Sequence, residues 1–287
     1  MTAGDIVEKL PAKQAESAEK SNSASERLAD HLSDENYIEQ QDQQLRDIEQ
    51  ETKMVPLIGP KIPFDVVVQE YTPHETPEFY FKASDLSDTY AWIRPMRRDG
   101  NCFYRAVLAA QVERIVRDPD ELRRFDAVCK GWKDRLLRLG FQEMTTTDFC
   151  DVFYELLNQI LAHELTLEQA LTKCNQDEYS NYYVIFLRLV ASGYLKEHAD
   201  EYAPFIDNGL PLEQYCAQEI ETMWRDVDHL AIQGLVSGLG LSLRIEYLDQ
   251  TAVPNGGTHY DIPADPAHPP PVVLLYRPGH YDLIFRR

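Results

Sequence analysis

Residues 97–107 read RRDGNCFYRAV, and this stretch decides how the rest of the chain is interpreted. Asp99, Gly100 and Asn101 are turn-forming residues, and the segment after them carries apolar residues at helical spacing. We therefore expect Cys102 to lie where a loop enters the N-terminus of a helix. Unpaired backbone N–H groups and the positive end of the helix dipole lie there, and both favour a thiolate over a thiol. The same N–H groups, with that of Gly100, are expected to form an oxyanion hole.

The sequence around the other cysteines differs from that around Cys102. The chain has five cysteines and no CxxC pair, so neither a disulfide framework nor a zinc site is predicted. Cys150 and Cys216 lie within apolar helical faces and are expected in the core, while Cys129 and Cys174 follow no turn signature. A small buried core residue is the ordinary alternative for Cys102 as well. Its position between a loop and a helix is what favours a nucleophile.

A cysteine nucleophile needs a base, and His280 is the best candidate among the eight histidines. It lies in RPGHYD, residues 277–282, between two apolar stretches that are typical of strands. The Pro-Gly pair marks a turn, so His280 is expected to open the final strand. Residues i and i+2 of a strand point to the same face, which places Asp282 beside His280 to fix its tautomer. The alternative is a polar start to an edge strand, and the pairing with Cys102 disfavours it.

A second His-x-Asp pattern, His259 with Asp261, occurs in GGTHYDIP and makes His259 the reserve candidate for the base. We expect this segment to be a loop. His229 follows Asp228 in a helical context, which favours a structural or binding role over catalysis. No set of histidine, aspartate and glutamate residues has the spacing of metal ligands, so we predict neither a metal site nor a cofactor.

The remaining sequence predicts a helical middle and a sheet made mostly by the C-terminal third. Residues 63–71, PFDVVVQEY, are expected to form an early strand or extended segment, although so short an apolar run also suits a helix. Helical periodicity then dominates four further segments, residues 120–140, 146–161, 181–198 and 212–224. Strand patterns appear late, in residues 241–249, 270–278 and 280–287. This order predicts the α+β class, with a helical subdomain and a small, mainly antiparallel β-sheet.

The N-terminal residues differ in composition from the rest of the chain. About the first thirty are rich in Ala, Ser, Glu and Lys and are expected to form a disordered arm. Ser33 caps the predicted helix that follows, with Asp34 and Glu35 in its first turn. This amphipathic helix either packs on the core or meets a partner. We therefore divide the chain into an arm with its partner-binding helix, residues 1–44, and a catalytic domain, residues 45–287.

Composition disfavours several classes of function. The 287 residues carry a formal net charge of -20, and 44% of them are hydrophobic, enough for a sizeable core. This charge disfavours nucleic acid and anionic membranes as partners, because both bind surfaces rich in lysine and arginine. No apolar run is long enough to span a bilayer, and no secretory signal is visible. Together with the unpaired cysteines, this predicts a reduced cytoplasmic protein, with the nucleus open as a second location.

Several motifs of the chain resemble those of the otubains, deubiquitinases of the ovarian-tumour superfamily. The resemblance is carried by RRDGNCFYRAV and LLYRPGHYDLIF, and in the same order along the chain by TTDFCDVFYELL, EYAPFIDNG, YCAQEIETMW, DHLAI and RIEYLD. It covers roughly Leu45 to the C-terminus. It implies a papain-like α/β fold and hydrolysis of the isopeptide bonds that join ubiquitin to lysine. It also implies a catalytic set placed here at Asp99, Cys102, His280 and Asp282, with Asp99 linked to oxyanion stabilisation.

The resemblance also implies binding residues and partners. The residues that resemble the family's contacts with the distal ubiquitin are Phe205, Ile206, Asp228, His229, Tyr260 and Ile262. Long-armed otubains use an N-terminal helix to engage a second ubiquitin, and they select the lysine linkage that marks proteins for the proteasome. They also bind ubiquitin-charged conjugating enzymes and block chain synthesis without cleaving anything. Ubiquitin, polyubiquitin and ubiquitin-conjugating enzymes are therefore the implied partners of a chain that we expect to be a monomer.

Two other interpretations of the same motifs stay open at this point. In the first, the chain is a non-catalytic inhibitor that sequesters ubiquitin-charged conjugating enzymes, and its triad is incidental. In the second, it is another Cys–His–Asp enzyme, such as an acyltransferase or a transglutaminase, which passes an acyl group to an amine in place of water. Nothing in the motifs around Cys102 and His280 favours the second interpretation.

Overall fold

The computed structural model of the protein describes residues 55–206, 209–251, 259–265 and 267–287. Within it, Val55–Arg287 form one compact unit. The predicted arm, its helix after Ser33 and the domain boundary at residue 45 all lie outside the described residues. The fold and the site below therefore concern the part of the chain that carries Cys102 and His280.

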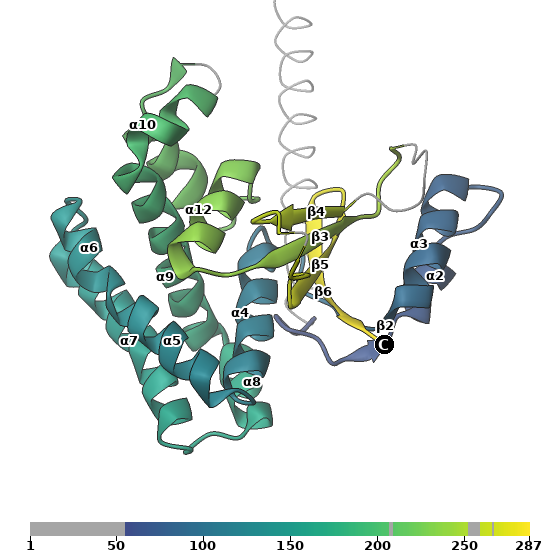
Figure 1. Cartoon of the computed structure of the whole chain (residues 1–287), viewed down its shortest axis with the longest axis horizontal. Coiled ribbons are helices and arrows are strands. Elements are labelled where there is room, and N and C mark those ends of the chain that lie inside the picture. Colours follow the sequence, from purple (N-terminus) through teal and green to yellow (C-terminus); the bar gives the residue numbers. More distant parts are fainter. Residues whose placement is uncertain (1–54, 207–208, 252–258, 266) are drawn as a thin grey trace, which may run out of the picture. The chain divides into compact units, whose positions relative to one another are not determined.

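A mixed sheet of six strands lies at the centre of this unit (Figure 1). Its strands follow the order β1-β2-β6-β5-β3-β4; the β3–β5 pair is parallel and the other four pairs are antiparallel. The bounds are β1 Ile62–Pro63, β2 Tyr90–Arg94, β3 Leu243–Tyr247, β4 His259–Ile262, β5 Val272–Arg277 and β6 His280–Arg286. Four of the six strands come from the C-terminal third, so the predicted α+β class with a mainly antiparallel sheet is confirmed.

Both faces of the sheet are covered, because its central strands send apolar side chains alternately to either side. Along β5, Val272 and Leu274 pack into the larger core cluster, whereas Val273 packs into a second, smaller cluster. Two helices, α2 Asp65–Gln69 and α3 Pro77–Thr89, contribute to the smaller cluster. The other helices lie on the opposite side of the sheet, where the larger cluster is formed (Figure 1).

Most of the helical residues lie between β2 and β3 in the sequence. The α-helices there are α4 Cys102–Ile115, α5 Pro119–Lys130, α6 Trp132–Arg138, α7 Glu143–Leu161, α8 Leu167–Cys174, α9 Asp177–Glu197, α10 Ala199–Tyr202, α11 Leu212–Tyr215 and α12 His229–Leu239. A 3-10 helix, η1 Ala203–Phe205, and a π-helical turn, η3 Cys216–Ile220, lie among them. The four predicted helical segments are confirmed, except that the first is split at Gly131 and the last ends at Ile220.

Helix α4 is the central helix because the sheet and the other helices both pack on it. Every residue of α4 except Arg114 is buried. It contacts β5 and β6 on one side and α5, α8 and α9 on the others. A helix that is covered on all sides can lie only in the interior of a domain. Cys102 is its first residue, so the candidate nucleophile is positioned by the most deeply packed helix of the fold.

Two short segments differ from the sequence-based predictions. Residues 65–69, within the predicted strand 63–71, form helix α2. The strand prediction is wrong because Phe64 and Val67, three residues apart, are both buried in the smaller cluster, a spacing that suits a helical turn. The segment that begins at His259 was expected to be a loop, but it forms the edge strand β4, paired antiparallel with β3.

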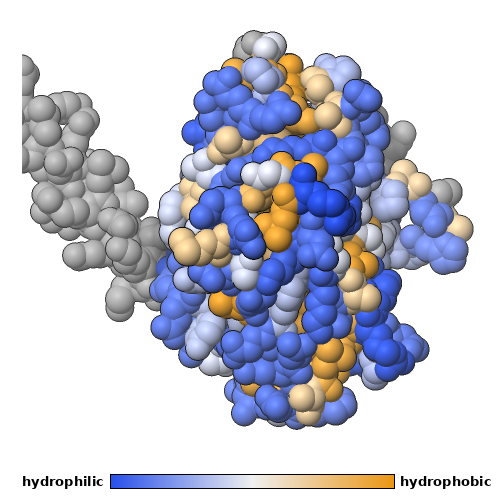
Figure 2. Space-filling model, turned by 90° about the vertical axis from the view of Figure 1, so that its left-hand side faces the viewer, coloured by the Kyte–Doolittle hydropathy of each residue, from blue (hydrophilic) through white to orange (hydrophobic). Residues whose placement is uncertain are grey.

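The helical side of the protein has a mostly hydrophilic surface (Figure 2). Hydrophobic residues lie on this face in separate groups between hydrophilic ones. The exposed large apolar side chains of the described part are Val55, Phe81, Trp92, Met144, Tyr182, Phe205, Trp224 and Tyr260. Within the described ranges, none of the helices is long and apolar enough to cross a bilayer.

The close approach of α12 to α9 at Gly234 can be tested by one substitution. A Cβ at this position would lie 2.6 Å from the backbone O of Ala191, and the two helices would have to separate to relieve the contact. We expect Gly234→Ala to lower the free energy of unfolding, measured by urea denaturation, by about 1–3 kcal/mol. Gly131→Ala is the matched control, because its nearest contact would be 3.4 Å and its backbone is helical. Equal losses in the two variants would contradict the close approach.

Candidate active site

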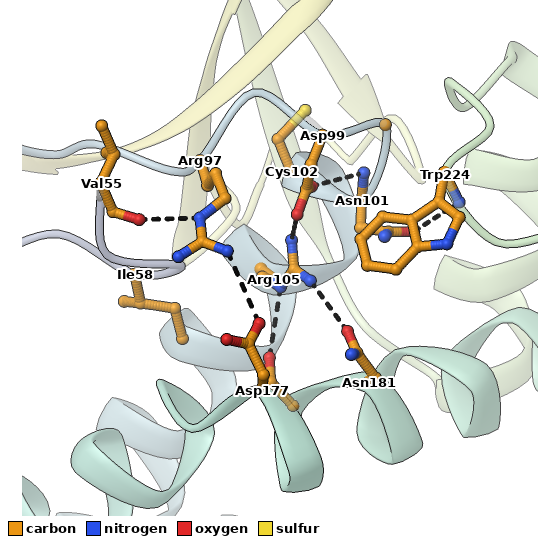
Figure 3. Close-up of polar contacts among 12 residues, drawn as sticks. Val55, Ile58, Arg97, Asp99, Asn101, Cys102, Arg105, Asp177, Asn181 and Trp224 are labelled. Carbon is orange, nitrogen blue, oxygen red and sulfur yellow. Dashed lines mark hydrogen bonds and ion pairs between the residues drawn. The ribbon is translucent and has the colours of Figure 1, made fainter. Parts of the chain in front are cut away.

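Cys102 lies at the N-terminus of α4, directly after the catalytic loop, residues 99–101 (Figure 3). Gly100 has a φ of +70°, and a Cβ there would lie 2.3 Å from the backbone O of Trp224, so both the turn and the space require glycine. The cysteine is only 5% exposed, and its Sγ accepts a hydrogen bond from the Tyr281 backbone N–H at 3.4 Å. The predicted position between a loop and a helix is therefore present, and it faces the start of β6.

The β5–β6 hairpin brings His280 to this loop. His280 is the first residue of β6, and Asp282 lies two residues on, with its side chain on the same face as predicted. Nε2 of His280 and Oδ1 of Asp282 are 2.8 Å apart, and both side chains are almost fully buried. Nδ1 of His280 has no hydrogen-bond partner among the described residues. Since the neighbouring Tyr281 bonds to Cys102, the thiol and the histidine belong to one buried site.

The Asp282 carboxylate determines which ring nitrogen of His280 is free to accept a proton. Its Oδ1 also accepts from the Met96 backbone N–H at 2.9 Å, and its Oδ2 accepts from the Arg277 guanidinium at 2.6 Å. Burial alone would raise the pKa of Asp282, but the hydrogen bond and charge of His280, with Arg277 and Met96, lower it below its usual value. An ionised carboxylate can only accept, so Nε2 carries the ring proton and Nδ1 is free to take another.

Burial opposes the ionisation of the Cys102 thiol. It raises the pKa of this thiol to about 11 against the hydrogen bond from Tyr281, and the charges of Asp282 and Asp99 raise the pKa further. Desolvation therefore acts against the thiolate that the helix N-terminus was expected to favour. A neutral thiol needs a base as it attacks, and this is the chemical role that Nδ1 of His280 can fill.

Asp99 holds the shape of the catalytic loop. One of its oxygens accepts from the Asn101 backbone N–H at 3.0 Å, and the other is paired with the fully buried guanidinium of Arg105 (Figure 3). Arg105 in turn donates to Ser180 and Asn181 of α9, both at 3.2 Å. Because the N–H of Asn101 is used in this way, the N–H groups in the first turn of α4 are left as oxyanion donors. Asp99 can thus assist an oxyanion by fixing the loop that precedes those donors.

A second buried arginine, Arg188 of α9, also holds the catalytic loop. It was not among the residues predicted from the sequence. Its guanidinium donates to Gly100 O at 2.9 Å and to Asn101 Oδ1 at 2.7 Å. It also donates to the backbone O of Ile220 at 2.9 Å and of Arg225 at 2.7 Å. The available signal was an arginine within the apolar helical run NYYVIFLRLVAS, where a buried charge needs several partners.

The reserve candidate for the base is not supported. His259 lies on the edge strand β4, which β3 and β5 separate from β6 in the sheet. Its partner in the pattern, Asp261, accepts two hydrogen bonds from Arg244, at 2.7 and 2.8 Å. The carboxylate is therefore already engaged by a guanidinium on β3. His280 and Asp282 instead flank Tyr281, whose backbone N–H bonds to Cys102.

The remaining cysteines lie in the interior. Cys129, Cys150, Cys174 and Cys216 are all buried, which confirms the prediction that Cys150 and Cys216 belong to the core. Burial raises the pKa of each of these thiols. Among the residues that the structure describes, no group of three or more His, Cys, Asp or Glu side chains is placed to hold a metal ion.

Five of the six predicted ubiquitin contacts, all except Ile262, are exposed or partly exposed. Phe205 is 69% exposed and Tyr260 is 40% exposed, which is high for aromatic side chains. The ring of His229, also exposed, lies 5.4 Å from that of Tyr260, so α12 and β4 meet at this point. Ile206, next to Phe205, is partly buried against the larger core cluster. The two exposed aromatic residues are the strongest candidates for contact with a protein.

Two of the predicted contacts, the exposed Asp228 and the buried Ile262, also have structural roles. Asp228 is the N-cap of α12, where its Oδ1 accepts from the Ala231 backbone N–H at 2.9 Å. Ile262 is only 2% exposed, because it lies opposite Leu243 in the sheet and packs into the larger core cluster. The prediction for the Ile262 side chain is therefore wrong. This side chain packs β4 onto the larger core cluster and is too buried to contact a partner.

Comparison with known proteins identifies one family. The family model described as Peptidase C65 Otubain matches residues 50–286. The chain is 48% identical to a ubiquitin thioesterase otubain-like protein of Caenorhabditis elegans over 248 residues, which are 86% of this chain and 87% of that one. It is 35% identical to ubiquitin thioesterase OTUB1 of Homo sapiens over 254 residues, which are 88% of this chain and 90% of that one.

Solved structures show the same fold. The protein matches a chain in the ceOTUB1–ubiquitin aldehyde–UBC13~Ub complex with a TM-score of 0.83 and 48% identity, over 85% of this chain and 99% of that one. It matches a chain in the h/ceOTUB1–ubiquitin aldehyde–UBCH5B~Ub complex with a TM-score of 0.82 and 46% identity, over 88% of this chain and 98% of that one. The helical layer and the six-stranded sheet are therefore shared with proteins of solved structure.

The raised pKa of Cys102 predicts the pH dependence of its alkylation. A thiolate reacts with iodoacetamide and a thiol does not, so the rate in the free protein should be low at neutral pH and rise toward the pKa of about 11. Mass spectrometry of the peptide containing Cys102 measures the rate, at pH values where circular dichroism remains native. Cys102→Ala gives the background from other sites. A rate already maximal at neutral pH would show that the free protein holds a thiolate.

Proposed function

Because the chain belongs to the otubain family, Peptidase C65, we propose that it is a deubiquitinating cysteine protease that hydrolyses isopeptide bonds between ubiquitin and lysine. One observation carries the proposal: the bond from Nε2 to Asp282 leaves Nδ1 of His280 unpaired in the site that holds the Cys102 thiol. The relatives in Caenorhabditis elegans and Homo sapiens are ubiquitin thioesterases. A thiol, a base and an orienting carboxylate form the constellation that nucleophilic acyl transfer requires.

The first half of the proposed reaction forms a thioester. Nδ1 of His280 takes the thiol proton while Sγ of Cys102 attacks the carbonyl carbon of ubiquitin's C-terminal glycine. The electron pair of the carbonyl moves to its oxygen, where the N–H groups in the first turn of α4 stabilise the negative charge. The Asp282 carboxylate, 2.8 Å away, stabilises the imidazolium. His280 then gives the proton to the lysine amine as the C–N bond breaks.

Water completes the cycle. Nδ1 of His280 takes a proton from a water molecule, whose oxygen attacks the thioester carbonyl, and the C–S bond breaks as the proton passes to the sulfur. The products are ubiquitin with a free carboxylate and Cys102 again as a neutral thiol. Asp282 stays ionised throughout, because Arg277 and Met96 bond to its oxygens whatever the charge of His280.

The proposal extends to linkage, location and state of assembly. We propose that the protein selects the polyubiquitin linkage that sends proteins to the proteasome, on the ground of its resemblance to long-armed otubains. Its net charge of -20 favours partners with basic or mixed surfaces. We further propose that it acts as a monomer in the cytoplasm and the nucleus.

A second function is favoured by the solved relatives. Two of them were determined together with ubiquitin aldehyde and with UBC13~Ub or UBCH5B~Ub. We propose that this chain likewise binds ubiquitin-charged conjugating enzymes and blocks chain synthesis. Such inhibition needs a binding surface and no thiol, so it is compatible with the protease activity. The acyltransferase and transglutaminase interpretations gain no support from any of these relatives.

Cleavage of di-ubiquitins tests the protease directly. Wild-type protein should split mainly the proteasome-targeting dimer, and Cys102→Ala should split none, as followed on denaturing gels with dimers of every linkage. Asp282→Asn should keep a residual rate, about 10²–10⁴-fold lower, because the nucleophile and the oxyanion donors remain while the tautomer of His280 is no longer fixed. Cys216→Ala, which removes a fully buried thiol from the core, is the matched control and should retain activity. Wild-type protein that splits no linkage would refute the protease proposal.

Inhibition of chain synthesis separates the two functions. In a reaction with a charged conjugating enzyme, Cys102→Ala should inhibit chain formation as well as the wild type does, because binding needs no nucleophile. Deletion of residues 1–44 should abolish this inhibition, since the proposed second ubiquitin contact lies in the arm. If the deleted protein still inhibits fully, the arm has no part in the second function.

A further inference from the structure

Trp224 combines two features that are unfavourable for a folded protein. Its side chain is 57% exposed, and its backbone has a φ of 65°, in the left-handed region that favours glycine. A bulky residue in this conformation is strained, and such strain is often found at functional sites. Core packing does not explain it, because Met223 and Val227 pack against the larger core cluster and Trp224 does not. Met223 and Val227 therefore anchor the segment on either side of Trp224, whose own side chain is left in solvent.

The backbone of Trp224 is held against the catalytic loop. Its carbonyl group fills the space that a side chain at Gly100 would need, and its N–H lies 3.4 Å from Asn101 Oδ1 (Figure 3). The carbonyl of the next residue, Arg225, accepts from Arg188 at 2.7 Å. The same guanidinium bonds to Gly100 and Asn101. One buried arginine thus holds both the backbone that carries the exposed indole and the catalytic loop.

The segment around Trp224 joins the catalytic loop to the surface on which ubiquitin is expected to bind. It ends at Asp228, the cap of α12, and the next residue, His229, lies against the ring of Tyr260. Under the proposed function, the C-terminal tail of a ubiquitin bound on that surface reaches Cys102 along this segment. The tail ends in glycine, which has no side chain. An enzyme can recognise such a residue only through backbone hydrogen bonds and through flat walls that fit its main chain.

We propose that the indole of Trp224 is a wall of the channel for ubiquitin's C-terminal tail. The ring packs against the main chain of the tail and keeps water away from the scissile carbonyl. This inference rests on the proposed function and adds a substrate-contacting residue that takes no part in proton transfer. Because every ubiquitin conjugate has the same tail, the contact acts equally on all linkages and does not depend on the leaving group.

Three substitutions separate the ring from the backbone. Glycine adopts a φ of 65° without strain, so Trp224→Gly removes the ring and also relieves the backbone. Trp224→Ala removes the ring but keeps a Cβ in the same conformation. Both should lower kcat/KM about tenfold, mainly through a higher KM, and Trp224→Phe should lose about threefold or less. Phe81→Ala is the matched control: it removes a ring that is 60% exposed from α3 and should leave the kinetics unchanged.

Two substrates locate the contact. Di-ubiquitin and a thioester of ubiquitin with a small thiol share the tail, but only in di-ubiquitin is the leaving group a lysine amine. Equal losses on the two substrates support the inference. A loss confined to di-ubiquitin would place Trp224 on the lysine side and overturn it. Wild-type kinetics in Trp224→Gly would overturn it as well, since the backbone and not the ring would then matter.

A binding measurement gives a readout independent of turnover. In Cys102→Ala protein, added ubiquitin should shift the tryptophan emission to shorter wavelength as the indole is covered, and Trp224→Phe should abolish the shift. Trp132 is fully buried and Trp92 on β2 is exposed, so the loss of the shift in Trp224→Phe is what assigns the signal to Trp224. Ubiquitin that binds by calorimetry without any shift would refute the inference. Wild-type protein that neither binds nor hydrolyses ubiquitin would instead refute the proposed function itself.

Discussion

The geometry of the active site depends on one buried guanidinium. Arg188 lies on α9 inside the larger core cluster, under the ring of Tyr104 at 4.4 Å, and burial lowers its pKa. Its charge is acceptable there because it meets two oxygens of the catalytic loop and the carbonyls of Ile220 and Arg225. Leaving a buried charge without its partners costs about 3–5 kcal/mol. The loop, the helix and the segment after η3 therefore adopt their positions together, and the nucleophile is placed as a result.

The base is positioned by a second arginine from the other side of the sheet. Arg277 donates to Asp282 at 2.6 Å and, with another nitrogen, to Glu70 beside α2 at 2.6 Å. The carboxylate that orients His280 is therefore linked to the layer that holds the smaller core cluster. The loop before Cys102 is thus held from the helical layer, whereas Asp282 is linked to the layer of α2 on the other face of the sheet. This division explains why the site needs the whole domain rather than a local motif.

Local patterns in the sequence predicted the nucleophile and the base, because the physical causes act within a few residues. Turn formers before an apolar helix placed Cys102, and the alternation of a strand placed Asp282 beside His280. The arginines escaped prediction because their contacts are remote: Gly100 is 88 residues from Arg188, and Glu70 is 207 residues from Arg277. Hydrophobic periodicity gives no information about contacts between residues so far apart in the sequence.

The errors have equally specific causes. The run of valines in residues 65–69 suits either a helix or a strand, and the packing against Phe64 decided for a helix. The effect of burial on the Cys102 thiol was not foreseen, because the helix terminus is visible in the sequence and the burial is not. Ile262 was assigned to a binding surface because family resemblance gives a position in the chain and no exposure.

The placement of β6 has a consequence for biosynthesis. This strand, which carries both His280 and Asp282, follows every other described element in the chain, yet it lies inside the sheet between β2 and β5. The ribosome therefore releases the nucleophile helix long before the strand that completes the catalytic machinery. In the sheet, β6 lies between β2 and β5, so it has to pair with β2 across a large sequence separation. Under the proposed mechanism, a chain that lacks β6 has the nucleophile but no base.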